Sequence, residues 1–178
     1  ALTALDIETD SLDPIRARLV GLSLSVAPGE ACYVPVAHTY AGAPDQLALE
    51  TVVARLKPWL ENPAAAKVGH NVKYDGHVFA ALGIDVRGYA HDTMLESYVW
   101  EAHKAHTLES LAFRHLGRTA LTYEEVCGKG ANQIPFAPVL LLRHRMSALP
   151  SPLKSAAART CKAGPGLKQT LTPDLRFS

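Results

Sequence analysis

Hydrophobic residues form three short runs near the beginning of the chain, each with the length and composition of a β-strand. The runs cover residues 2–7, residues 19–26, where apolar and small polar residues alternate, and residues 31–36, which follow the turn residues Pro28 and Gly29. Short connections between such runs are typical of antiparallel strands that are consecutive in the chain. The pattern therefore predicts a meander of three antiparallel strands.

After these runs the spacing of apolar residues changes to that of α-helices. Asp45 has the side chain of an N-cap residue and precedes a helical pattern that continues to residue 60. Further helices are expected over residues 71–82, 92–102 and 107–116, with a fourth strand over residues 67–69. Strands followed by helices, with a strand set among them, indicate a mixed α/β domain.

The composition of the chain changes after residue 136. Residues 1–136 hold 16 acidic and 11 basic side chains, a net charge of −5, whereas residues 137–178 hold one acidic and 7 basic side chains, a net charge of +6. The second segment is rich in Pro, Ser, Ala and Arg, and its apolar residues show no sustained helical or strand periodicity. Both features are typical of poorly ordered sequence. We expect a globular domain over residues 1–136 and a basic tail over residues 137–178.

Length and composition exclude several classes of protein. The 178 residues suit one domain with an appendage, and no apolar run approaches the roughly 20 residues needed to span a bilayer. Three widely spaced cysteines give neither a disulfide framework nor a zinc-binding spacing, and the eight histidines show no metal-site pattern. The chain has no signal peptide and begins at Ala1, so we expect it to be part of a longer protein.

Two groups of polar residues are candidates for chemistry. Asp6 and Glu8 are two residues apart at the end of the first predicted strand, so their carboxylates point to the same side and suit Mg²⁺ or Mn²⁺. Asn71 and Asp75 are four residues apart at the start of a predicted helix and share a face. Structural explanations are also available, since Asn71 and Asp92 suit helix N-caps and Asp75 suits the first turn of a helix.

Three segments, taken together and in order, resemble the proofreading exonuclease domain of bacterial DNA polymerase I. They are DIETDSL from Asp6, VGHNVKYD ending at Asp75, and DTMLESY from Asp92. The segments at 56–60, 121–126 and 128–133 are similar to the same domain, so the resemblance covers roughly residues 1–136. It implies an α/β, RNase H-like 3′–5′ exonuclease fold, in which helices flank a mixed sheet. The resemblance also implies that this fold is incomplete at the C-terminus.

The resemblance also implies the catalytic and metal-binding residues of this chain. Asp6 and Glu8 would bind one divalent metal ion, Mg or Mn, while Asp6 and Asp75 would bind a second. Two such ions about 4 Å apart would clamp the attacking and leaving oxygens of a phosphodiester. The implied reaction is therefore the release of 5′ mononucleotides from a 3′ end.

The implied partner is the 3′ end of single-stranded DNA. By resemblance, the residues that would contact nucleic acid are Thr9, Leu12 as an apolar wedge, Asn71, Met94 and Tyr123. An aromatic residue at position 123 suits the stacking of bases without sequence preference. The resemblance further implies a polymerase domain fused to this one, the cytoplasm of a bacterium as the location, and no contact with a membrane.

The chain departs from the family at the fourth acidic residue. The family carries it in a Tyr-x-x-x-Asp pattern, which the spacing aligns with Ser147 and Ser151, and no tyrosine follows Tyr123. We hypothesise a reading-frame shift near residues 136–138, with a genuine divergent tail as the alternative. With three acids left, we expect very weak or no exonuclease activity and an uncovered apolar surface.

Two other functions remain open from the sequence. The domain could be a non-catalytic nucleic-acid-binding or structural relic, which would bind no metal ion at its carboxylates. It could also be an RNA-directed relative that uses the same acids.

Overall fold

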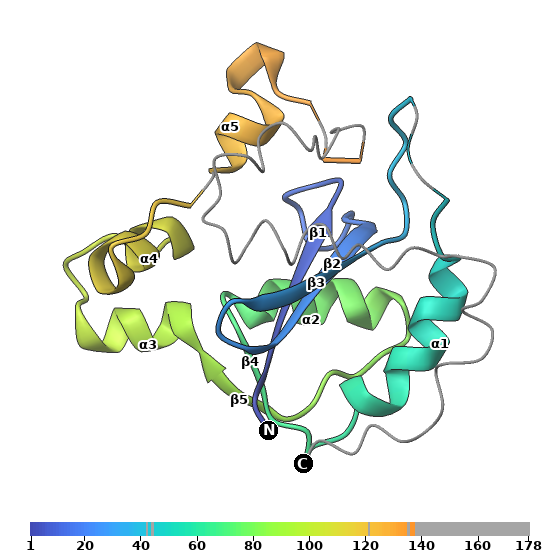
Figure 1. Cartoon of the computed structure of the whole chain (residues 1–178), viewed down its shortest axis with the longest axis horizontal. Helices are drawn as coiled ribbons and strands as arrows, with labels where there is room; N and C mark the ends of the chain where they lie inside the picture. The colour runs from blue at the N-terminus through green and yellow to red at the C-terminus, as the bar shows by residue number, and fades with distance from the viewer. Residues whose placement is uncertain (42, 44, 121, 135, 138–178) are drawn as a thin grey trace.

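The computed structural model describes residues 1–137 except 42, 44, 121 and 135 (Figure 1). This part of the chain forms five strands, five α-helices and a short 3₁₀-helix. In chain order the elements are β1 (Thr3–Thr9), β2 (Leu19–Ala27), β3 (Glu30–Pro35), α1 (Leu49–Leu60), β4 (Lys67–Gly69), α2 (Val72–Ala81), β5 (Tyr89–Asp92), α3 (Thr93–Trp100), α4 (Leu108–Leu116), α5 (Tyr123–Cys127) and the 3₁₀-helix (Gly130–Asn132). The predicted tail over residues 137–178 lies outside the described residues except for Ala137.

The five strands form one mixed sheet in the order β3-β2-β1-β4-β5. β1, β2 and β3 pair antiparallel, which confirms the predicted meander, while β4 runs parallel to β1 and β5 runs parallel to β4. The fourth strand falls at the predicted residues 67–69, but β5 was not predicted. β5 has only four residues, two of them His91 and Asp92, so it lacks the apolar alternation that identifies a strand.

The hydrophobic core lies between the sheet and helices α1 and α2. Leu5 and Ile7 alternate with polar residues along β1 and are buried together with side chains of both helices, including Val52, Leu60 and Phe79. Because side chains alternate along a strand, Asp6 and Glu8 face the opposite side of the sheet. The sequence therefore places an apolar row in the core and an acidic row on the opposite face of the sheet.

Helix α1 begins three residues later than the sequence predicts, so Asp45 as its N-cap is wrong. The helix starts at Leu49, and its N-cap position, Ala48, has no side-chain capping bond. The Gln46 side chain instead accepts from the backbone N–H of His38 at 2.8 Å and donates to its carbonyl at 2.8 Å. This long-range pairing holds residue 46 outside the helix, which the local pattern does not reveal.

The remaining helices agree with the predicted ones within two residues. Thr107 caps α4 by accepting from the Ser110 N–H, and Gly117 ends that helix with a φ of 61°. α5 was not predicted because its five residues are too few for a periodic pattern. The Thr122 side chain caps it through a capping box with Glu125.

Helices α3 and α4 leave large apolar side chains exposed, as the sequence led us to expect. The exposed fractions are 89% for Val99, 76% for Trp100, 66% for Phe113 and 69% for Leu116. Both helices lie to one side of the sheet, away from α1 (Figure 1). Within the described part of the chain, no helix is long and apolar enough to cross a membrane.

Candidate active site

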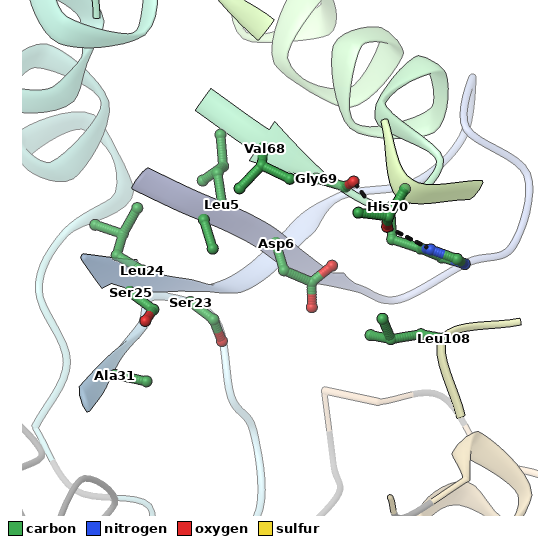
Figure 2. Close-up of a pocket in the computed structure, with 12 residues that line it drawn as sticks. Leu5, Asp6, Ser23, Leu24, Ser25, Ala31, Val68, Gly69, His70 and Leu108 are labelled. Atoms are coloured by element: carbon green, nitrogen blue, oxygen red, sulfur yellow. Dashed lines mark hydrogen bonds between the residues drawn. The ribbon is translucent and has the colours of Figure 1, made fainter. Parts of the chain in front are cut away.

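Strand β1 carries the first two candidate carboxylates on the face of the sheet opposite the hydrophobic core of Leu5 and Ile7. Asp6 lies opposite Ser23 and Glu8 opposite Gly21 on the neighbouring strand β2. The Asp6 side chain lines a cavity of about 230 Å³ on this face, together with residues of β2, β4 and the start of α4 (Figure 2). The predicted orientation of the pair toward one side is therefore realised.

Helix α2 supplies the third carboxylate. Asp75 lies in its first turn and is only 4% exposed, and its Oδ2 atom has no hydrogen-bond partner in the part of the chain that the structure describes. A buried carboxylate oxygen without a partner is costly. Asp75 is thus poised to accept a ligand that the protein itself does not provide.

The three carboxylates influence one another electrostatically. Burial, together with the charges of Asp6, Asp92 and Glu8, raises the pKa of Asp75 to about 8. Burial and the neighbouring Asp6 charge raise the pKa of Glu8 to about 7. The pKa of Asp6 is also raised because the surrounding protein atoms desolvate it, although the side chain keeps contact with solvent. The fold therefore gathers three carboxylates whose negative charges disfavour one another.

This donor set fits a hard divalent cation by its chemistry. All three side chains offer carboxylate oxygens, the ligands that Mg²⁺ and Mn²⁺ prefer, and Asp75 has an unused oxygen. Among residues 1–137, with the stated gaps, no three His, Cys, Asp or Glu side chains are already gathered closely enough to hold an ion. The carboxylates therefore lie near one another but have still to converge on a cation.

The loop after β1 carries two of the predicted nucleic-acid contacts, Thr9 and Leu12. The Thr9 hydroxyl lies 2.6 Å from the Tyr74 hydroxyl and donates to the Ser11 carbonyl at 3.0 Å. Tyr74 also donates to the Ser11 carbonyl, so this phenol ties the loop to α2. Leu12 is 75% exposed, as an apolar side chain available for contact would be.

Tyr74 was missed as a candidate although it stands directly before Asp75 in the segment that carries the resemblance. Nothing in local spacing shows that a helical tyrosine reaches a loop 63 residues earlier in the chain.

Asn71 occupies the N-cap position of α2 but does not cap the helix with its side chain. Its backbone is left-handed, with φ 66° and ψ 47°. The backbone N–H groups of Asn71 and Val72 instead donate to the Asp92 carboxylate at 3.1 and 3.0 Å. The capping role considered for Asn71 therefore belongs to Asp92, which the sequence associated only with its own helix, α3.

His70 lies beside Asp6 at the rim of the cavity. Its Nδ1 atom is 2.9 Å from the Thr93 hydroxyl, which donates to the Gly69 carbonyl at 3.2 Å (Figure 2). Because the single hydroxyl proton goes to Gly69, the proton between Thr93 and His70 belongs to Nδ1, which donates to the hydroxyl oxygen.

Tyr33 reaches across Gly21, the residue opposite Glu8. A Cβ atom on Gly21 would stand 1.9 Å from the Tyr33 hydroxyl oxygen, so any larger residue there would displace the Tyr33 ring. The hydroxyl lies 2.7 Å from Nε2 of His38, and burial together with the Glu8 charge raises the pKa of Tyr33. Sequence inspection did not identify this pair, because it depends on the strand register.

The last two predicted contacts lie at helix starts. Met94 is the second residue of α3, half-buried, and its N–H donates to Asp92 at 3.0 Å. Tyr123 is the first residue of α5. The structure thus brings Asp6, Glu8 and Asp75 into one electrostatic group, and the roles of the contact residues stay predictions.

Comparison with known proteins identifies the same activity class. A family model described as 3′–5′ exonuclease matches residues 2–141. DNA polymerase I of Pseudomonas aeruginosa is 46% identical over 143 residues, which are 79% of this chain and 16% of that protein. DNA polymerase I of Chloroflexus aurantiacus is 39% identical over 138 residues, 76% of this chain and 14% of that protein. The chain thus spans about one sixth of the length of these relatives.

Solved structures support the fold. The POL domain of Pol1 from M. smegmatis, in complex with DNA primer-template and dNTP, aligns with a TM-score of 0.56 and 24% identity, covering 67% of this chain and 19% of that one. Brucella melitensis NrnC aligns with a TM-score of 0.54 and 19% identity, covering 89% of this chain and 66% of that one. At these identities the likeness concerns the fold alone, and it agrees with the predicted α/β, RNase H-like arrangement.

Proposed function

The chain belongs to the 3′–5′ exonuclease domain family represented in bacterial DNA polymerase I, and on this premise we propose that it binds divalent metal ions at Asp6, Glu8 and Asp75. The observation that carries the proposal is the buried Oδ2 of Asp75, which has no hydrogen-bond partner among the described residues and is exposed to the charges of Asp6 and Glu8. Burying like charges without compensation is costly, and a divalent cation removes that cost.

We propose the 3′ end of single-stranded DNA as the substrate. When bound, two Mg²⁺ or Mn²⁺ ions would supply an activated water and stabilise the leaving oxygen of the terminal phosphodiester. The protein's own part is to hold the end in place. Thr9, fixed by Tyr74, and the exposed Leu12 lie on the loop that follows the catalytic strand, where a terminal nucleotide would contact them.

We further propose that this chain hydrolyses DNA very weakly. The family's fourth acid and its preceding tyrosine have no counterpart, because Ser147 and Ser151 stand at the aligned positions. Losing one group of a catalytic unit that acts together usually costs orders of magnitude in rate. A reading-frame shift near residues 136–138 would account for the loss.

The nucleotide sequence around codons 130–155 tests that origin. A single-base change that restores a downstream Tyr-x-x-x-Asp pattern would support the frame shift. If no such change exists, the segment is a genuine tail.

The test of the function is a Mn²⁺-dependent digestion of 5′-labelled single-stranded DNA and RNA of the same sequence. We expect slow stepwise shortening of DNA from the 3′ end, at a turnover well below about one per second, and none with Asp6→Ala. Turnover near one per second would contradict the weak-activity proposal. Preferential shortening of RNA would favour the RNA-directed alternative, and no shortening together with no Mn²⁺ binding would favour the inert relic.

A further inference from the structure

Asp92 joins the starts of two helices with one carboxylate. Its Oδ1 atom accepts from the N–H groups of Met94 at 3.0 Å and Leu95 at 3.3 Å in its own helix, α3. The same carboxylate accepts from Asn71 at 3.1 Å and Val72 at 3.0 Å at the start of α2. An ordinary N-cap satisfies N–H groups of one helix only, so the contacts to α2 need a separate explanation.

The neighbouring residue extends this connection. Thr93 donates to the Gly69 carbonyl at 3.2 Å, and its hydroxyl lies 2.9 Å from Nδ1 of His70. Asp92 and Thr93 together therefore contact four consecutive residues, 69–72, that lead from β4 into α2.

The backbone pairing of β4 with the catalytic strand β1 does not extend into this segment. The pairing of β1 with β4 is confined to Thr3 with Lys67 and Ala4 with Val68, so it ends before Gly69. Asn71 adopts a left-handed backbone that non-glycine residues rarely take, and both its N–H and the next one are bound by Asp92. Asp75 follows within the first turn of α2, so the direction of that turn decides where its carboxylate points.

We propose that Asp92 is a positioning residue for the metal site: by bridging the starts of α2 and α3 it fixes the Asp75 carboxylate opposite Asp6 and Glu8. This inference rests on the proposed function, because it assigns Asp92 a role in the same site. Asp92 acts through α2 and is not itself a ligand in this proposal.

The substitution Asp92→Ser separates bridging from simple capping. Serine is a good N-cap, so its hydroxyl can still accept from the start of α3. Its single, shorter oxygen cannot also reach the amides of Asn71 and Val72. A residue that only caps α3 would therefore tolerate serine, whereas a bridging residue would not.

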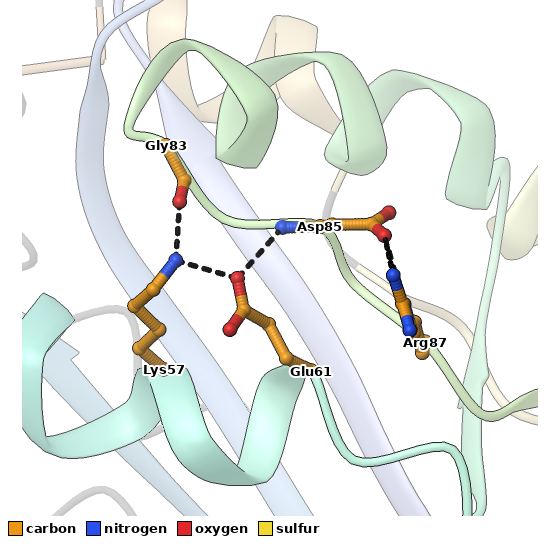
Figure 3. A network of polar contacts seen from close by, with 5 residues as sticks. All are labelled: Lys57, Glu61, Gly83, Asp85 and Arg87. Atoms are coloured by element: carbon orange, nitrogen blue, oxygen red, sulfur yellow. Dashed lines mark hydrogen bonds and ion pairs between the residues drawn. The ribbon is translucent and has the colours of Figure 1, made fainter.

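Glu61→Gln provides a matched control at the other end of the sheet. Glu61 is also a carboxylate that joins two elements, since its Oε1 accepts from Lys57 Nζ at 2.5 Å and from the Asp85 N–H at 3.2 Å (Figure 3). These contacts connect the end of α1 to the segment before β5. They involve none of the residues that follow the carboxyl ends of β1 and β4, where the proposed metal site lies.

The experiment measures Mn²⁺ affinity by calorimetry and amide hydrogen exchange on the full chain. We expect Asp92→Ser to weaken Mn²⁺ binding roughly 10- to 100-fold, as loss of a supporting contact around a metal site typically does. The Val72 amide should lose protection while the Leu95 amide keeps it. Glu61→Gln should bind Mn²⁺ within about twofold of the wild type, because distant sites act independently.

The possible results separate the inference from the function. Wild-type Mn²⁺ affinity in Asp92→Ser would overturn the inference and leave the metal site standing. If the wild type binds no Mn²⁺, the proposed function is wrong and the inference falls with it. Should Asp92→Ser fail to fold, Asp92→Asn keeps the size and one carbonyl oxygen, and an Mn²⁺ affinity equal to that of Glu61→Gln would overturn the inference.

Discussion

Replacing Asp75 by Asn should stabilise the metal-free protein, although Asp75 is proposed to be a catalytic ligand. The side chain is 4% exposed, and one of its carboxylate oxygens has no hydrogen-bond partner among the described residues. Burial, together with three acidic neighbours, raises its pKa. Asparagine keeps the size of the side chain and removes the charge. A residue that binds a cation thus destabilises the fold until the cation arrives.

The magnitude follows from proton linkage. The pKa of Asp75 is about 8 in the folded protein, against an ordinary value of 3.8. Between pH 3.8 and about pH 8 the folded state binds more protons than the unfolded state. The free energy of unfolding therefore falls as pH rises, by up to about 1.4 kcal/mol per pH unit. The stabilisation is fully present below pH 4 and is lost near pH 8, a loss of about 6 kcal/mol at most.

The assay is urea unfolding followed by circular dichroism, in EDTA, from pH 4 to pH 8. The free energy of unfolding of Asp75→Asn should equal that of the wild type near pH 4. At pH 8 it should be about 3–5 kcal/mol higher than that of the wild type. Mn²⁺ should raise the stability of the wild type and leave that of the variant unchanged. Glu8, whose pKa is raised to about 7, retains a smaller pH dependence of the same sign in the variant.

Asp85→Asn is the control. Its carboxylate is 69% exposed and pairs with Arg87. The substitution should therefore change the free energy of unfolding by less than about 1 kcal/mol at every pH. The reasoning is refuted if Asp75→Asn is no more stable than the wild type at pH 8.

Three further predictions concern other parts of the molecule. Tyr74→Phe removes the phenol that holds Thr9, and we expect roughly tenfold weaker binding of single-stranded DNA by fluorescence anisotropy, with unchanged affinity arguing against a role for the loop. Lys67→Met should lower the free energy of unfolding in urea by about 2–4 kcal/mol, because the buried ammonium donates to three backbone carbonyls; an unchanged midpoint would contradict this. Val99→Lys combined with Phe113→Lys should raise the concentration at which light scattering detects aggregates, whereas unchanged scattering would mean that these exposed side chains do not associate.

The sequence pattern was sufficient to predict a residue's place where that place depends only on its own strand or helix. Strand alternation predicts that Asp6 and Glu8 share one side of β1, and Leu5 and Ile7, which alternate with them, are buried in the core. Thr107 and Gly117 correctly marked the ends of α4, because helix caps depend on neighbouring residues.

Residues that act across the sheet could not be assigned in this way. Asp45 has a capping side chain, yet the contact of Gln46 with His38 keeps its segment out of α1. The start of α2 is capped by Asp92, 21 residues further along the chain. The nearness of Asp75 to Asp6 likewise depends on β4 lying beside β1, which only the assembled sheet provides.

A calorimetric titration with Mn²⁺ tests most directly whether Asp6, Glu8 and Asp75 form a cation site. We predict saturable binding by the wild-type chain at pH 8, and loss of that binding in Asp6→Asn and in Asp75→Asn. Both variants must be shown to fold by circular dichroism. Absence of Mn²⁺ binding in the wild type, or undiminished binding in either folded variant, would contradict the account.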